Sequence, residues 1–151
     1  MSTSSGQPLV AETLARMDEG WSEFHRRVQG FPAQLLDQHL AEGSWTRKQM
    51  LAHVATWHDR TVEALVRLIE TGELPGAPEA TDAINARAAR AAVGRTTGEI
   101  LFSVVDSYRL VRRAVARLTD AQLTAHDGWA VAMIAANTYD HYAEHLADLG
   151  G

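Results

Sequence analysis

Four stretches of this chain repeat apolar residues at alternating spacings of three and four, and this period constrains the fold more than any other feature. Such spacing places the repeated residues on one face of an α-helix. No segment alternates apolar and polar residues over the length of a strand, so β-structure is not expected. The four stripes are Val10, Leu14, Met17, Trp21, Phe24 and Val28; Met50, Val54, Trp57, Thr61, Ala64 and Leu68; Leu101, Val104, Tyr108, Val111, Val115 and Leu118; and Val131, Ile134, Thr138, His141, His145 and Leu149.

Capping and breaking residues separate the stripes. Two capping boxes, in which a Thr and a Gln or Glu three residues later satisfy each other's backbone N–H groups, precede the second and third stripes. Asp127 is the candidate N-cap of the fourth helix. Glycine and proline end the first two helices. The residues concerned are Thr46 with Gln49, Thr96 with Glu99, Gly30 with Pro32, and Gly72 with Pro75, Gly76 and Pro78.

The predicted fold is all-α, an antiparallel four-helix bundle. A long crossover joins the second and third helices and contains a short extra helix at about 81–92. The segment "TDAQLTAHDG" is expected to link the third and fourth helices. A length of 151 residues suits one domain, 1–151, of which residues 1–7 are expected to be flexible.

Composition narrows the classes of function. A formal net charge of −5 does not favour nucleic acid or an anionic membrane as a partner. The absence of cysteine excludes disulfides, thiolate zinc sites and a cysteine nucleophile. "MSTSSGQP" lacks the features of a signal peptide, and no stretch reaches the roughly 20 apolar residues of a membrane span. We therefore expect a cytoplasmic, soluble protein.

His141 and His145 occupy the apolar stripe of the fourth helix, where a plain bundle would place hydrophobic residues. Because they are one turn apart, both rings can reach one divalent ion, at about 2.0–2.1 Å each for zinc. A third ligand must come from another helix; His53 is the best candidate and His58 the competitor. Three imidazoles would leave a coordination position open, as in catalytic sites. The alternative is that these are buried histidines satisfied by hydrogen bonds. The opposite face of this helix is expected to carry Asn137, Asp140, Glu144 and Asp148.

Other residues are candidates for roles around such a site. Tyr139 and Asp106 can carry protons, although ordinary interhelical hydrogen bonding would account for them equally well. Arg60 lies two turns after His53 and can hold an anionic substrate or be a surface residue. Trp57 can line an apolar pocket or belong to the core.

"GSWTRKQMLAHVATWHDR" and "NTYDHYAEH" resemble the DinB/YfiT-like superfamily of metalloenzymes, in order and spacing over nearly the whole chain. "DAINARAARAAVGRTTGEILFSVVDSYRLVRRAVARLTDAQL" and "HYAEH" are most similar to the ClbS/DfsB-like branch. The resemblance implies a four-helix bundle, often dimeric, with a divalent metal held by a triad, zinc and nickel being the plausible ions. Carried over by position, the triad is His53, His141 and His145.

The resemblance also implies a class of reaction. Members of the superfamily include transferases and isomerases that use a low-molecular-weight thiol, and the ClbS-like branch includes a hydrolase that opens an electrophilic cyclopropane. We expect the metal to activate a thiol cosubstrate or water for attack on an electrophilic small molecule. The alternatives are a protein that sequesters a small molecule or metal without turnover, and a purely structural bundle. A homodimer is also expected, since the outer sides of the first and third helices are rather apolar.

Overall fold

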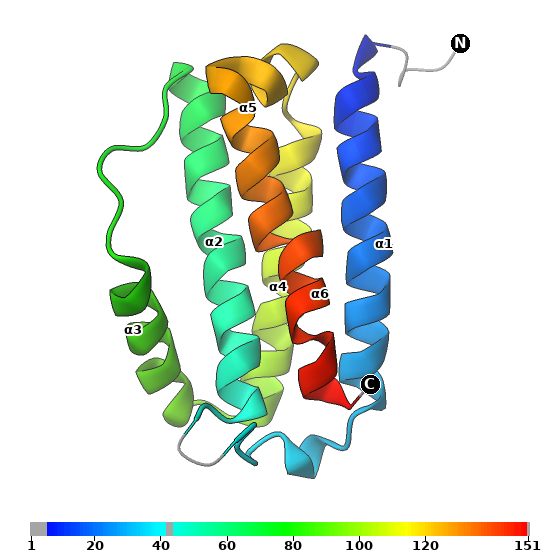
Figure 1. The fold of residues 1–151 in the computed structure, drawn as a ribbon, viewed down its shortest axis with the longest axis vertical. Coiled ribbons are helices and arrows are strands. Elements are labelled where there is room, and N and C mark those ends of the chain that lie inside the picture. Colours follow the sequence, from blue (N-terminus) through cyan, green and yellow to red (C-terminus); the bar gives the residue numbers. More distant parts are fainter. Residues whose placement is uncertain (1–5, 42–43, 151) are drawn as a thin grey trace.

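The computed structural model describes residues 6–41 and 44–150, which form a helical bundle with no strand among them (Figure 1). The all-α class predicted from the sequence is therefore confirmed. Residues 1–5 of the segment expected to be flexible lie outside this description, whereas the Gln7 side chain accepts a hydrogen bond from the backbone N–H of Asp120. The helices are α1 (Pro8–Gly30), α2 (Arg47–Thr71), α3 (Thr81–Val93), α4 (Thr97–Ala116), α5 (Asp120–Asn137) and α6 (Tyr139–His145), with short 3-10 helices at Ala33–Leu35 (η2) and Leu146–Leu149 (η3).

The crossover between α2 and α4 determines the topology. As predicted, it contains a short helix, α3, which packs beside α2 through buried Ile84, Ala89 and Ala92. Gln49 on α2 donates a hydrogen bond to the carbonyl of Ala89, 3.1 Å away. Because α3 returns the chain to the end where α2 began, α2 and α4 run in the same direction (Figure 1). The predicted crossover thus makes this pair parallel, while α1 and α4 are antiparallel, as are α2 and α5.

The fourth helix expected from the sequence is divided into α5 and α6, a division that was not predicted. The two together are the fourth rod of the bundle. A capping box of Thr119 and Gln122 starts α5 within the segment expected to be a link. The dihedral angles at 125–128 are not helical, and Asp127 has φ 58°, so its prediction as an N-cap residue was wrong. A second break at Thr138, with φ −123° and ψ −103°, separates α5 from α6. The two predicted capping boxes, Thr46 with Gln49 and Thr96 with Glu99, are both confirmed.

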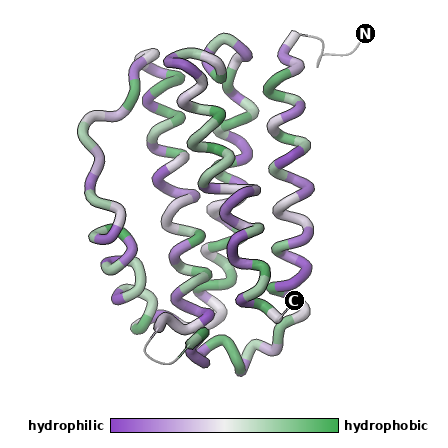
Figure 2. Tube along the Cα trace, in the orientation of Figure 1, coloured by the Kyte–Doolittle hydropathy of each residue, from purple (hydrophilic) through white to green (hydrophobic). Residues whose placement is uncertain are grey.

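The apolar stripes meet along the axis of the bundle. Apolar segments recur between polar ones along each long helix, as expected of amphipathic helices (Figure 2). The fully buried side chains include Met17, Phe24, Leu65 and Ile134. Val131, expected on the fourth stripe, is instead 36% exposed, and Ala130, one residue earlier, is buried together with Ile134 and Thr138. Among the described residues, no helix combines the length and apolar character needed to cross a bilayer.

Candidate metal centre

Three histidines from two helices converge on one point. His53 Nε2 of α2 lies 2.8 Å from His141 Nε2 of α6, and His145 Nε2 lies 3.2 Å from the same atom. All three potential ligand atoms fall within 4.8 Å of one another. Nitrogens bonded tetrahedrally to one zinc ion at about 2.05 Å would be about 3.3 Å apart, close to these spacings. The structure thus brings together the three residues predicted as ligands.

The break between α5 and α6 and a close contact with α1 hold the histidine-bearing turn in place. Thr138, fully buried at the break, donates its hydroxyl to the Ile134 carbonyl at 2.6 Å. The next residue, Tyr139, packs directly on Gly20 of α1, where an added Cβ would lie 2.9 Å from Tyr139 Cβ. Only a residue without a side chain permits this approach, so Gly20 allows α6 to lie close against the bundle.

Two outer partners determine which ring nitrogen carries the proton. Asn85 Oδ1 accepts the indole N–H of Trp57 at 2.8 Å, and His53 Nδ1 lies 3.0 Å from the same oxygen. Since that atom is an acceptor, His53 Nδ1 must donate. His145 Nδ1 likewise donates to the Asp148 carboxylate at 2.8 Å. With Nδ1 protonated, both rings direct the lone pair of Nε2 toward the centre of the triad.

The electrostatics of the triad favour a cation at its centre. Burial, with a contribution from neighbouring His145, lowers the pKa of His53 to about 4. Burial, with contributions from His53 and His145, lowers the pKa of His141 to about 3. The rings of His53 and His141 are therefore neutral near pH 7, and His141 Nε2 can donate a proton to only one of the two lone pairs that face it. Among the described residues, His141 Nδ1 is itself buried without a hydrogen-bond partner. A divalent ion would accept all three lone pairs at once, and three imidazole ligands suit zinc or nickel.

The triad is enclosed on one side and open on another. Trp45 lies against His53, with ring centroids 5.1 Å apart. His145 is the most exposed of the three, with 19% of its side-chain surface accessible, whereas His53 and His141 are buried. Three protein ligands with an accessible edge leave room for an external ligand, which is the pattern of a catalytic rather than a structural metal site.

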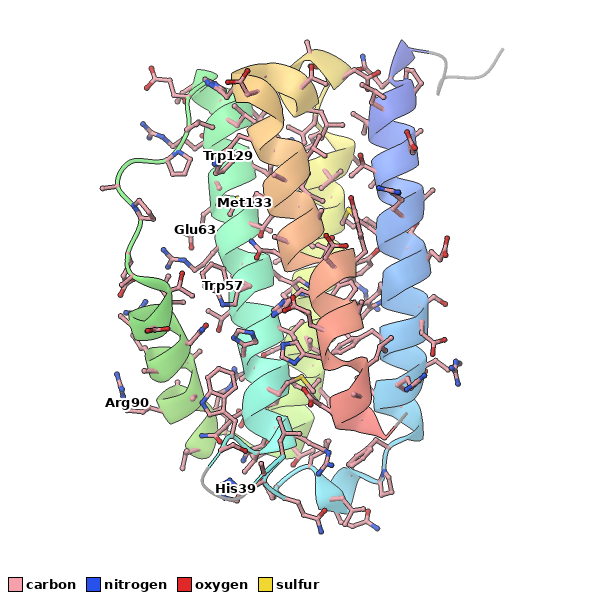
Figure 3. The ribbon with its side chains drawn as sticks, viewed as in Figure 1. His39, Trp57, Glu63, Arg90, Trp129 and Met133 are labelled. Atoms are coloured by element: carbon pink, nitrogen blue, oxygen red, sulfur yellow. The ribbon has the colours of Figure 1, made fainter. Side chains whose placement is uncertain are left out.

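Both residues predicted to contact substrate line one cavity of about 410 Å³. It is enclosed by α2, the crossover loop before α3, α3 itself and α5. Figure 3 shows Trp57 and Glu63 of α2 and Trp129 and Met133 of α5 along this part of the molecule. Trp57 also donates to Asn85, which accepts from His53, so hydrogen bonds at Asn85 connect this cavity-lining residue to the triad.

The two residues predicted as proton carriers are not brought to the triad. Tyr139 faces α1, where the Arg16 guanidinium lies 5.5 Å from its ring centre, and lines a separate groove between α1 and the fourth rod. Asp106 lies on α4 near Asp59 of α2, whose pKa is raised by burial and, to a smaller extent, by the charges of Glu63 and Asp106. Within residues 6–41 and 44–150, no hydrogen bond connects either side chain to the three histidines.

His58, the competing candidate, belongs to the core. It is fully buried, with Nδ1 2.8 Å from Ser107 Oγ and Nε2 2.6 Å from the Tyr142 hydroxyl. Burial lowers its pKa to about 3, so it is neutral in the folded protein. Both ring nitrogens have partners, and His58 therefore joins α2, α4 and α6 without facing the triad's centre.

Sequence reasoning missed Asn85 and misplaced Asp148. Asn85 lies on the crossover helix, and no local pattern indicates which side of that helix faces α2. Asp148 was expected opposite the histidines, and this placement was wrong. Residues three apart lie on the same side of an α-helix, and in the 3-10 turn η3 that follows His145 they are superposed. The Asp148 carboxylate accordingly lies beside His145.

The DinB superfamily matches this chain over residues 16–148, a span that includes all three histidines. The protein therefore belongs to the DinB superfamily. Neither the curated proteins nor the solved structures contain a match. The ClbS/DfsB-like branch and the homodimer, which the sequence resemblance implied, stay predictions.

Proposed function

We propose that this protein binds one divalent ion, zinc or nickel, through Nε2 of His53, His141 and His145, and that it is an enzyme acting on an electrophilic small molecule. The main support is the convergence of two lone pairs on a third imidazole that cannot satisfy both. When bound, the ion would lower the pKa of a coordinated thiol or water, so that a thiolate or hydroxide is present near neutral pH.

The chain's own residues orient the ligands and admit the nucleophile. Asn85 and Asp148 keep the protons of His53 and His145 on Nδ1, which aims both Nε2 atoms at the ion. With no cysteine in the chain, an attacking thiol must come from a cosubstrate, and water is the other candidate. The exposed edge of His145 provides the path by which either enters and by which its proton leaves. The proposal gives no proton-transfer role to Tyr139 or Asp106, since neither lies at the triad.

Metal content per chain is the first test. The protein would be purified without an affinity tag, as wild type, His141→Ala and His39→Ala, the last an exposed histidine outside the triad whose ring pairs with the Ser44 carbonyl. We expect about one zinc or nickel per chain in wild type and His39→Ala, and loss of most of it in His141→Ala with unchanged helical circular dichroism. A His141→Ala protein that kept full metal content would refute the ligand assignment.

Turnover then separates an enzyme from a sequestering protein. Metal-loaded protein would be incubated with a thiol and an excess of an aryl halide electrophile, with the stripped protein as control. We expect product well beyond one equivalent per chain, and only with metal present. If the protein bound metal or electrophile only up to one equivalent per chain, without turnover with any thiol tested or with water alone, sequestration would be favoured instead.

A further inference from the structure

The cavity beside the triad has the size and walls of a small-molecule site. Its volume of about 410 Å³ lies within the range of about 300–1,000 Å³ usual for such sites. Much of the wall is apolar, formed by Trp57, Ala64, Ile84, Trp129 and Met133. The indole N–H of Trp57 is turned to Asn85, so the remaining edge and face of the ring are left for an occupant. Two tryptophans and a methionine favour a flat, apolar occupant.

One cation on the wall is only loosely paired. The nearest carboxylate to the Arg60 guanidinium belongs to Glu79, 3.8 Å away. Glu79 is already held by both terminal nitrogens of Arg87, which is the main reason that its pKa is lowered. Arg67, by contrast, donates to the Leu74 carbonyl at 3.0 Å. Arg60 therefore has donors free for an anion, and planar guanidinium groups pair best with a carboxylate.

Helix geometry sets the length of the occupant. Arg60 lies seven residues after His53 on α2, a rise of about 10.5 Å along the axis at 1.5 Å per residue. Trp57 lies between them, one turn from His53. A molecule that paired with Arg60 and reached the triad would thus lie along Trp57 and span about 10 Å, roughly two fused rings and a short substituent.

We propose that this cavity binds a planar, apolar molecule with one carboxylate, which pairs with Arg60 while the rings lie among Trp57, Trp129 and Met133. The inference rests on the proposed function only in naming the occupant as substrate, with its electrophilic carbon directed to the triad. Binding itself requires no metal, so the site can be tested on stripped protein.

The test is calorimetric titration of metal-free protein with 2-naphthoate, and with 2-naphthalenemethanol and 2-naphthylmethylammonium as neutral and cationic matches. We expect naphthoate to bind about tenfold or more tightly than either match. Arg60→Gln should weaken naphthoate about tenfold and leave the alcohol unchanged, because only the ion pair is lost. Arg90→Gln, on the outer side of α3 (Figure 3), is the matched control and should bind as wild type.

A second variant guards against an indirect effect of Arg60. Met133→Trp fills the cavity and should abolish binding of all three probes, with circular dichroism reporting an intact fold. The proposal is overturned by absence of naphthoate binding, by equal binding of the alcohol or tighter binding of the ammonium, or by an unchanged Arg60→Gln. The two proposals fail independently: absence of naphthoate binding would not change the metal-content result, and absence of metal would not change the result of this titration.

Discussion

Replacing Asn85 by leucine should weaken zinc binding at the triad roughly 5- to 70-fold, although Asn85 does not touch the ion. Its Oδ1 accepts the proton of His53 Nδ1 and so aims His53 Nε2 at the centre. Leucine is of similar size and favours a helix more than asparagine does, so α3 should stay intact. The variant therefore removes the two hydrogen bonds that Asn85 accepts, from His53 and from Trp57, and keeps the helix that carries residue 85.

The magnitude follows from what the ligand loses. A neutral hydrogen bond contributes about 0.5–1.5 kcal/mol net. Fixing the His53 ring in one orientation, which Asn85 no longer does in the variant, costs about 0.5–1 kcal/mol more. The sum of about 1–2.5 kcal/mol corresponds to the predicted factor, and it overlaps the 10- to 100-fold losses typical of outer-partner substitutions.

The assay is competition for zinc against a chromophoric chelator at pH 7.5, where free histidine is largely unprotonated. Asn85→Asp should bind zinc as tightly as wild type or more tightly, since a carboxylate accepts the same proton and makes the ring more basic. Arg87→Gln, two residues along the same helix, should bind as wild type because Arg87 pairs with Glu79 outside the triad. An Asn85→Leu affinity within twofold of wild type would refute the positioning role, as would an equal loss in Arg87→Gln.

Three further expectations concern stability. His58→Leu should destabilise the metal-free protein by about 1–3 kcal/mol at pH 7.5 in urea unfolding, because the buried Tyr142 hydroxyl loses its partner; equal stability would contradict the buried network. Because the pKa of His58 falls from about 6.5 unfolded to about 3 folded, the unfolded state binds more protons below pH 6.5. The stability that His58 contributes is therefore complete above pH 6.5 and decreases by up to about 1.4 kcal/mol per pH unit on acidification. The stability difference between wild type and His58→Leu should narrow at pH 5.5, and a wider difference would contradict a lowered pKa for His58. Gly20→Ala should lower the melting temperature, because the added Cβ would clash with Tyr139. Gly98→Ala, whose added Cβ would meet no atom nearer than 4.0 Å, should raise stability by up to about 1 kcal/mol. A Gly20→Ala protein as stable as Gly98→Ala would show that α6 can move away from α1.

Patterns among residues close in the sequence predict much of the fold and the three candidate ligands. The apolar stripes and the capping boxes at Thr46 and Thr96 depend on residues three or four apart, so they can be predicted without the tertiary structure. His141 and His145 were recognisable for the same reason, being one turn apart at positions that a plain core would fill with hydrophobes. His53 was the best candidate for the third ligand and His58 the competitor, because both lie on the apolar side of α2, and the family resemblance then favoured His53 by its position.

Contacts between distant segments decided the rest, since nothing local encodes them. The parallel run of α2 and α4 depends on where the crossover returns, and the pairing of Asn85 with His53 depends on how α3 packs against α2. The sequence by itself therefore determined a helical bundle with three inward histidines. Only the tertiary structure determined how their protons are held and that Trp57 and Arg60 share a cavity, because those features join residues that are separated along the chain and meet only by packing.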